Sequence, residues 1–302
     1  MSVRIGIGLG LGSLRSPQDY WRCIDDCEDS GIGSIWYSDQ LLGSSLEPMA
    51  LLAARTSRLR FGTNALVLPF REPLTVAMQL ATIHFLSSGR VFPVLGVGKA
   101  VDPYWEVTGA QAIDGGRCSN ESITLLWALL AQEEVVFTSA HFQYHGPGIQ
   151  PRPQTPIPLW TGGHSKAPIW RTAELGDGWL GGLIGASETR LRIEAALAET
   201  GRTIEADHYG VSLPLRIGAA NDPSVIAAQD RLGGRLPVAE SAELGDAFAV
   251  GPPESIVALL RRYVAQGMSK FVVLPIANDA VDLKEQTQLL VRHVLPAIED
   301  RS

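Results

Sequence analysis

The sequence predicts a (β/α)8 TIM barrel, an α/β fold that takes up the whole chain, residues 1–302, as a single domain. Short apolar runs alternate with amphipathic segments in eight successive units, and this βαβα order requires a parallel sheet. A chain of 302 residues, 45% of them hydrophobic and 19% charged, can also bury one large core. An open doubly wound sheet is the alternative, but eight units favour the closed barrel.

The first half of the chain shows this order clearly. Val3–Gly10 alternates small and branched residues, as a crowded buried strand does, and Ser16-Pro17 starts a helix that ends near Gly31. Pro93 cannot donate to a strand ladder, so we expect a bulge or a late strand start there. Strands are expected at about 34–38, 59–67 and 91–98, and helices at about 47–56, 73–86 and 117–132.

The second half continues the pattern and adds two insertion segments. Residues 135–144, in the segment after the fourth strand, form two apolar runs separated by a polar turn, which predicts a small hairpin outside the main pattern. Residues 220–245, after the seventh strand, fit no unit of the repeat. Strands are expected near 158–161, 178–180, 209–217 and 271–274. Helices are expected to begin near 165, to cover 187–200, to end near 266 after Gly251–Glu254, and to cover 283–299.

Composition argues against several classes of partner. The net charge of -7 and the absence of a basic patch argue against nucleic-acid binding, which needs phosphate neutralisation. No apolar run approaches the roughly 20 residues that span a bilayer. Three cysteines that cannot all pair, with no recognisable signal peptide, indicate the cytoplasm. The six histidines show no spacing suited to a metal ion, so no metal site is predicted.

A glycine turn follows the fifth predicted strand. Gly162-Gly163 lets the backbone approach a ligand closely, and the free N–H groups of the helix after it favour an anion such as phosphate. The alternative is a tight turn without a ligand. His164 is the one histidine on an expected loop at the barrel mouth, and Ser165-Lys166 adds a hydroxyl and a cation there.

Other polar residues stand where strands of a barrel end, which is where such folds collect their chemistry. Asp39-Gln40 follows the second strand and Lys99 follows the fourth. Lys99 is a candidate ligand contact or a solvated rim lysine. Arg71, in the loop after the third strand, could contact an anion, although an exposed arginine is usually solvated.

A set of short motifs resembles the bacterial luciferase-like superfamily, the flavin- and deazaflavin-dependent barrels, and within it the coenzyme F420-dependent oxidoreductases. In order and spacing the motifs cover nearly the whole chain. They are Trp36-Tyr37-Ser38-Asp39, Arg60-Phe61-Gly62-Thr63, Leu86–Val91, Leu95-Gly96-Val97-Gly98, Thr161-Gly162-Gly163, Ala173–Trp179 and Val250–Glu254.

The resemblance implies a site. In this family the third strand ends in a bulge with a non-prolyl cis peptide that supports the central ring of the cofactor, and the matching bond here is Asn64-Ala65. Gly162-Gly163 matches the segment whose amides hold the cofactor phosphate, and Asp39 matches an acid beside the cofactor. The implied cofactor-binding residues are Asp39, Asn64, Ala65, Lys99, Gly162, Gly163 and His164, and the candidates for the substrate side are Trp36, Asp39, Gln40 and Tyr104.

Two departures from the family pattern bear on catalysis. Many of its deazaflavin-dependent dehydrogenases have a histidine directly after the aspartate, where this chain has Gln40. An amide cannot exchange a proton near neutral pH, although it donates and accepts hydrogen bonds. The sugar-phosphate dehydrogenases also carry a glutamate soon after the fourth-strand glycines, where ungapped alignment places Val101, with Asp102 and Glu106 displaced. Alcohol oxidation by that acid-base pair is therefore not expected.

The resemblance implies an F420-dependent oxidoreductase that transfers hydride to or from an unassigned small organic substrate, with Gln40 and Asp39 as the candidate catalytic residues. One alternative is an FMN-dependent monooxygenase that takes reduced flavin from a partner reductase, because the same phosphate turn would serve it. Another is a cofactor-binding barrel without catalysis, since the histidine and the glutamate are missing. The family also implies a homodimer.

Overall fold

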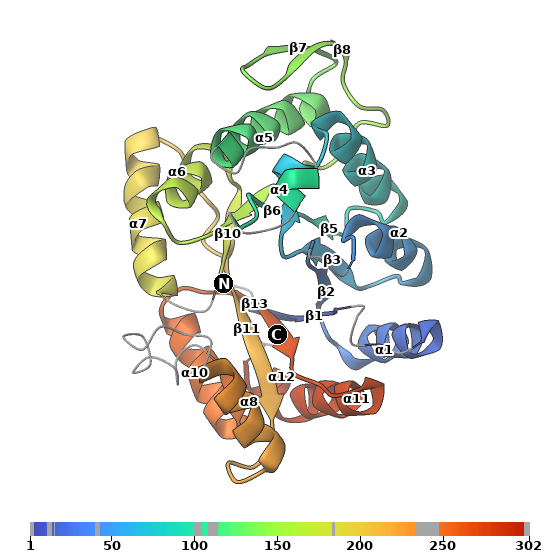
Figure 1. Cartoon of the computed structure of the whole chain (residues 1–302), viewed down its shortest axis with the longest axis vertical. Coiled ribbons are helices and arrows are strands. Elements are labelled where there is room, and N and C mark those ends of the chain that lie inside the picture. Colours follow the sequence, from blue (N-terminus) through green and yellow to red (C-terminus); the bar gives the residue numbers. More distant parts are fainter. Residues whose placement is uncertain are drawn as a thin grey trace. The chain divides into compact units, whose positions relative to one another are not determined.

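The computed structural model describes residues 3–10, 14, 16–39, 43–99, 104–107, 114–182, 185–233 and 248–298. Strands and helices alternate along much of the chain (Figure 1). The chain divides into two compact units. Unit 1 comprises Met1–Trp36, Leu180–Arg192 and Glu205–Ser302, and unit 2 comprises Tyr37–Trp179 and Ile193–Ile204.

Unit 1 is built on a parallel sheet in the order β11-β13-β1-β2, with β12 paired to β11. Ile5 of β1 lies opposite Phe271 of β13, and Ile7 lies opposite Ile35 of β2. All nine residues of β11 are buried, as expected for a parallel strand covered on both faces. The strands are β1 (Arg4–Gly8), β2 (Ser34–Tyr37), β11 (Tyr209–Ile217), β12 (Ala249–Gly251) and β13 (Lys270–Pro275).

Helices pack against this sheet, α8 and α11 against β11 and α10 against β12 (Figure 1). The first helix begins and ends as its sequence predicts: the Ser16 hydroxyl accepts from the amide of Asp19, and Gly31 ends the helix at φ 91°. The helical elements are α1 (Pro17–Ser30), α8 (Pro223–Gly233), α10 (Pro253–Ala265), α11 (Ala280–Leu289), a π-helical turn (Leu290–Val294) and α12 (Leu295–Ile298). β10 (Gly178–Gly181) and α7 (Ala186–Thr200) contain residues of both units.

Unit 2 contains short parallel strands because two predicted strands are each interrupted once. The strand expected at 59–67 breaks at Asn64-Ala65 into β3 (Arg60–Thr63) and β4 (Leu66–Val67). The strand expected at 91–98 is divided at Pro93 into β5 (Val91–Phe92) and β6 (Val94–Gly96), so a strand does begin directly after Pro93, as one of the two expectations had it. β3 pairs with β5, and β4, β6 and β9 (Trp160–Gly162) pair in that order, all parallel.

The helices of unit 2 are α2 (Leu46–Arg55), α3 (Pro73–Leu86), α4 (Tyr104–Val107), α5 (Gly115–Ala131) and α6 (Lys166–Leu175), with a 3-10 turn at Leu68–Phe70. The hairpin predicted within 135–144 is confirmed. It consists of β7 (Glu134–Thr138) and β8 (Gln143–Pro147), an antiparallel pair separate from the parallel sheet. After the seventh predicted strand, α8 occupies the first part of the expected insertion, while residues 234–247 lie outside the described residues.

Within the part of the chain that the structure describes, no helix is both long and apolar enough to cross a membrane. Over the same residues, no group of three or more His, Cys, Asp or Glu side chains is arranged to hold a metal ion.

Candidate functional site

The carboxyl ends of β4, β6 and β9 lie side by side at one edge of the unit 2 sheet, which we call the carboxyl edge of unit 2. Leu95 pairs with Leu66 on one side and with Thr161 on the other. The segments that leave these strands, residues 68–71, 97–99 and 163–165, therefore start from the same edge. The predicted residues Lys99, Gly163 and His164 belong to these segments.

The bond between Asn64 and Ala65 is a non-prolyl cis peptide, as the family resemblance implied. The backbone around it is held by the segment that follows β2. The amide of Asn64 donates to the Tyr37 carbonyl at 2.7 Å, the Ser38 hydroxyl donates to the Asn64 carbonyl, and the amide of Asp39 donates to the Ala65 carbonyl at 3.2 Å. These bonds fix residues 64–65 against residues 37–39.

Neighbouring strands add to this support. The Thr63 hydroxyl, fully buried, donates to the Val94 carbonyl at 2.8 Å and accepts from the Val94 amide at 2.9 Å. A Cβ added at Gly96 would stand 3.0 Å from the Cβ of Ala65, so the absence of a side chain at 96 lets β6 approach Ala65 closely. The backbone of residues 63–65 is thereby held from both sides.

Asp39 lies beside this backbone in an ion pair with Arg71. Arg71 Nε donates to Oδ2 and Arg71 Nη2 donates to Oδ1 of Asp39, each at 2.9 Å. The carboxylate also accepts from the amide and the hydroxyl of Ser45, at 3.1 and 2.9 Å, and from the amide of Val67 at 3.2 Å. Asp39 thus follows β2, as the sequence predicted, and both of its carboxylate oxygens accept hydrogen bonds from protein donors. Arg71, which sequence reasoning treated as a solvated side chain or an anion contact, is the partner of Asp39.

Lys99 is exposed beyond the end of β6, and its carbonyl accepts from the indole Nε1 of Trp105 at 2.7 Å. Trp105 of α4 is buried and stands edge to face with Phe70, with 4.9 Å between ring centroids. A Cβ at Gly115 would meet the Trp105 ring at 2.4 Å. Trp105 therefore fixes α4 over this edge, a role that no sequence motif indicated. Tyr104 is the first residue of α4, and its side chain lies outside the described part of the structure.

The glycine turn after β9 leaves no room for a side chain at position 163. Gly163 adopts φ 107°, and a Cβ there would stand 2.8 Å from Cβ of Pro168 in the first turn of α6. The Gly163 carbonyl accepts from Trp179 Nε1 at 2.8 Å, which fixes the direction of the turn. Ser165, the N-cap of α6, makes no side-chain capping hydrogen bond to the first turn of this helix.

The remaining positions singled out in the sequence are Trp36, Gln40 and Val101. Trp36 lies in unit 1, where its buried indole donates to the Ser34 hydroxyl at 2.8 Å and covers Gly6, whose added Cβ would meet Trp36 Nε1 at 2.6 Å. Gln40 and Val101 lie outside the described residues. The described contacts therefore bring together Asp39, Asn64 and Ala65. The strand order places Lys99 and residues 162–164 at the carboxyl edge of unit 2.

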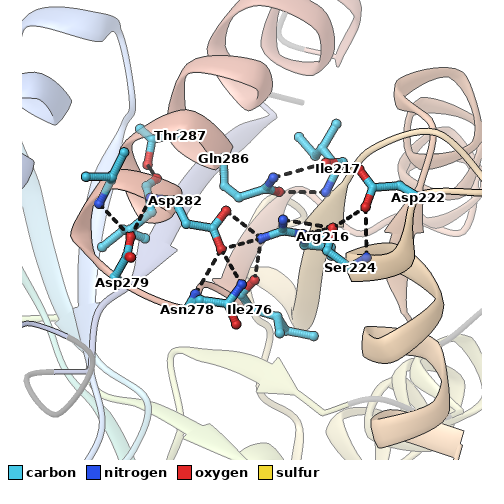
Figure 2. Close-up of polar contacts among 12 residues, drawn as sticks. Arg216, Ile217, Asp222, Ser224, Ile276, Asn278, Asp279, Asp282, Gln286 and Thr287 are labelled. Atoms are coloured by element: carbon cyan, nitrogen blue, oxygen red, sulfur yellow. Dashed lines mark hydrogen bonds and ion pairs between the residues drawn. The ribbon is translucent and has the colours of Figure 1, made fainter.

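Figure 2 shows a polar cluster at the ends of β11 and β13 in unit 1 that the sequence did not indicate. Arg216 Nη1 donates to both carboxylate oxygens of Asp282 at 2.6 and 2.7 Å and to the Ile276 carbonyl at 3.1 Å. The guanidinium also donates to the Ser224 hydroxyl, at 2.9 Å from Nη2. The Arg216 side chain thus joins the end of β11 to the starts of α8 and α11, and its charge is paired with that of Asp282. We interpret this cluster of Arg216, Ser224 and Asp282 as structural and call it the clasp.

The Gln286 side chain completes the clasp. Its oxygen accepts from the Ile217 amide at 2.6 Å and its nitrogen donates to the Ile217 carbonyl at 3.0 Å, so a side-chain amide replaces a strand neighbour at the end of β11 (Figure 2). A glutamine 69 positions away in the sequence gives no periodic signal, which is why sequence reasoning missed it.

Sequence relatives resemble this chain over most of its length. An F420-dependent glucose-6-phosphate dehydrogenase of Amycolatopsis mediterranei (strain U-32) is 26% identical over 301 residues, covering 85% of this chain and 88% of the relative. The enzyme of the same name from Intrasporangium calvum is 24% identical over 302 residues, covering 86% and 89%.

Solved structures share the fold. An F420-dependent secondary alcohol dehydrogenase in complex with an F420-acetone adduct superposes with a TM-score of 0.85 at 18% identity, covering 99% of this chain and 100% of that one. The monooxygenase RslO1 from Streptomyces bottropensis superposes with a TM-score of 0.82 at 16% identity, covering 97% and 99%. The model of the luciferase-like monooxygenase family matches residues 2–270. The chain therefore belongs to the luciferase-like monooxygenase family.

Proposed function

We propose that this protein is an oxidoreductase that binds coenzyme F420 at the carboxyl edge of unit 2 and transfers hydride between it and a small organic substrate. The observation that carries the proposal is the glycine turn with an uncapped helix start, at the same sheet edge as the held backbone of residues 64–65. Relatives along most of the chain are named F420-dependent, which supports the choice of cofactor.

The residues present fit a cofactor with a phosphate and a flat ring. A side chain at position 163 would fill the space between the turn and Pro168, and glycine leaves it open. The amides of Gly163 and of the first turn of α6 would hold the phosphate, with exposed His164 and Lys166 nearby as cations or donors. The backbone of Asn64-Ala65, held from both sides, would support the ring.

When bound, F420 supplies the hydride chemistry, and the protein supplies binding, orientation and exclusion of water. Lys99 would add positive charge near the anionic cofactor. Trp36, Gln40 and Tyr104 are proposed for the substrate side. The Gln40 amide can orient a substrate by donating and accepting hydrogen bonds, but it cannot take a proton from it.

This limits the class of reaction. With Gln40 and Val101 in place of the family histidine and glutamate, a reductase or another hydride-transfer enzyme fits better than a sugar-phosphate dehydrogenase, although relatives carry that name. The finer features of the proposal are a closed (β/α)8 barrel with insertions after strands 4 and 7, a homodimer, and a location in the cytoplasm.

Two other functions remain open to the same test. An FMN-dependent monooxygenase supplied by a partner flavin reductase is favoured by structural neighbours such as RslO1 and a type II Baeyer-Villiger monooxygenase in complex with FMN, the latter with a TM-score of 0.76 at 15% identity. A barrel that binds cofactor without turnover is favoured by the loss of the family histidine at position 40.

The test is a titration of the protein with F420 and, separately, with FMN, followed by turnover assays over a substrate panel. Tight binding of F420 without FMN, with turnover, supports the proposal. Tight binding of FMN without F420 would refute it in favour of the monooxygenase. F420 binding with no turnover across the panel would point to the non-catalytic barrel.

A further inference from the structure

The carboxylate of Asp39 is fully engaged by its neighbours in unit 2. Five protein donors contact its two oxygens: Nε and Nη2 of Arg71, the amide and hydroxyl of Ser45, and the amide of Val67. An ionised carboxylate offers about four lone-pair sites, and two N–H groups of one guanidinium already form a forked, charge-assisted pair with it. The side chain is 11% exposed. No oxygen is left over for a substrate proton.

The same contacts join separate pieces of the chain. Asp39 follows β2, Ser45 is the N-cap of α2, and Val67 and Arg71 stand at the two ends of the turn that follows β4. The Asp39 amide meanwhile donates to the Ala65 carbonyl at 3.2 Å. Asp39 therefore holds the segment 64–67 at two points, Ala65 through its backbone amide and Val67 through its side chain.

We infer that Asp39 and Arg71 act together as positioning residues, not as an acid or a base, and that their ion pair sets the backbone of residues 64–67 on which the cofactor ring would lie. The inference rests on the proposed function for its ligand, but the positioning of the backbone does not depend on which ring is bound. It changes the role assigned to Asp39 from the sequence, where it was a candidate catalytic group. It gives Arg71 a role that the sequence left open.

The design of the variants follows from the geometry. Asp39→Asn keeps the shape and one acceptor but removes the charge that Arg71 meets. Arg71→Met keeps much of the side-chain length and leaves the Asp39 carboxylate without its cation. Arg71→Lys keeps the charge but cannot bridge both oxygens at once. Arg117→Met is the matched control, because Arg117 Nε also lies 2.9 Å from a carboxylate oxygen, that of Glu121, on the outer helix α5.

Three measurements are made on each variant: the F420 dissociation constant by titration, the pH profile of any turnover, and amide hydrogen exchange of residues 64–67 without cofactor. We expect each single variant at 39 or 71, Arg71→Lys included, to weaken F420 binding about tenfold, because a small misplacement of a binding surface is costly. The double variant Asp39→Asn with Arg71→Met should bind no worse than the weaker single one, because both changes remove one interaction. Exchange at residues 64–67 should quicken, and the pH profile should keep its midpoints.

The outcomes separate the alternatives. A pH limb lost in Asp39→Asn at unchanged F420 affinity would make Asp39 the acid or base and overturn the inference. The inference would also be overturned if the double variant lost F420 affinity by the product of the two single losses. An equal loss of affinity in Arg117→Met would overturn it as well. If the wild type binds no F420, the proposed function fails, while the exchange measurement still decides whether the ion pair holds residues 64–67.

Discussion

Gly163→Ala tests the proposed phosphate-binding turn most directly, because the structure shows what an added Cβ would meet. The residue adopts φ 107°, where an L side chain is strained by roughly 1–2 kcal/mol. The new Cβ would also stand 2.8 and 2.9 Å from Cβ and Cγ of Pro168, closer than real Cβ contacts. Relieving that overlap costs about 1–3 kcal/mol, as overpacking does elsewhere.

The overlap with Pro168 is relieved by moving the turn away from α6. Pro168 belongs to the first turn of α6, so the Cβ pushes the turn and the helix start apart and misaligns their amides. Losing one hydrogen bond to a charged group costs about 1.5–3 kcal/mol, which corresponds to about ten- to a hundredfold weaker F420 binding. Titration with F420 measures this loss, and chemical denaturation measures the stability.

Gly31→Ala is the control, because Gly31 also has a positive φ, 91°, but nothing lies within 4 Å of its added Cβ. It should lose only the stability that the backbone conformation costs, roughly 1–2 kcal/mol, with unchanged F420 affinity. If Gly163→Ala binds F420 as tightly as the wild type, the turn does not hold the phosphate and the site model is refuted.

Other predictions concern separate features. Gln40→His should introduce a midpoint near pH 6.5 into the pH profile of turnover, and an unaltered profile would mean that position 40 is not catalytic. Glu121 of α5 tethers the β7-β8 hairpin, because the His141 amide donates to its Oε2 at 2.9 Å and His141 Nδ1 lies 2.8 Å from the same oxygen. Burial alone would raise the pKa of Glu121, but hydrogen bonds, chiefly from His141, lower it to about 2 from 4.5. This tether should therefore hold above pH 4.5 and weaken progressively toward pH 2. Hydrogen exchange of the hairpin measures this, and Glu121→Gln should abolish the pH dependence. Helix α3 has no Asp, Glu, Lys or Arg, and Phe85 and Met78 are 64% and 53% exposed. We therefore expect Phe85→Glu to convert the proposed homodimer to single chains in native mass measurements, and an unchanged mass would place the interface elsewhere.

Much of the fold could be predicted because its signals are local. The Ser16 cap and Gly31 fix the first helix within a few residues, and Pro93 marks the interruption between β5 and β6. The break at Asn64-Ala65 was a different case. Nothing in the composition of residues 59–67 indicates it, and it was located only through the family resemblance.

The clasp around Arg216 could not be predicted at all. Its partners Ser224 and Asp282 lie 8 and 66 positions away, and no periodic pattern links residues at such separations. Trp105 was missed for a related reason: its contacts with the Lys99 carbonyl and the Phe70 ring depend on where a four-residue helix settles over the sheet edge.

Asp39 shows how the contacts of a residue bear on the role that its position in the sequence suggests. Chemistry in a parallel fold gathers where strands end, so an acid after β2 is a sound candidate from sequence. Whether that acid can exchange a proton depends on its donors, and these come from Ser45, Val67 and Arg71, 6 to 32 positions further along the chain. Arg71 was visible in the sequence, but as an isolated cation it is more often solvated than paired. With Asp39 engaged and an amide at position 40, hydride transfer at this site would depend on how the ring and substrate are held, and the residues that hold the ring become the sensitive ones.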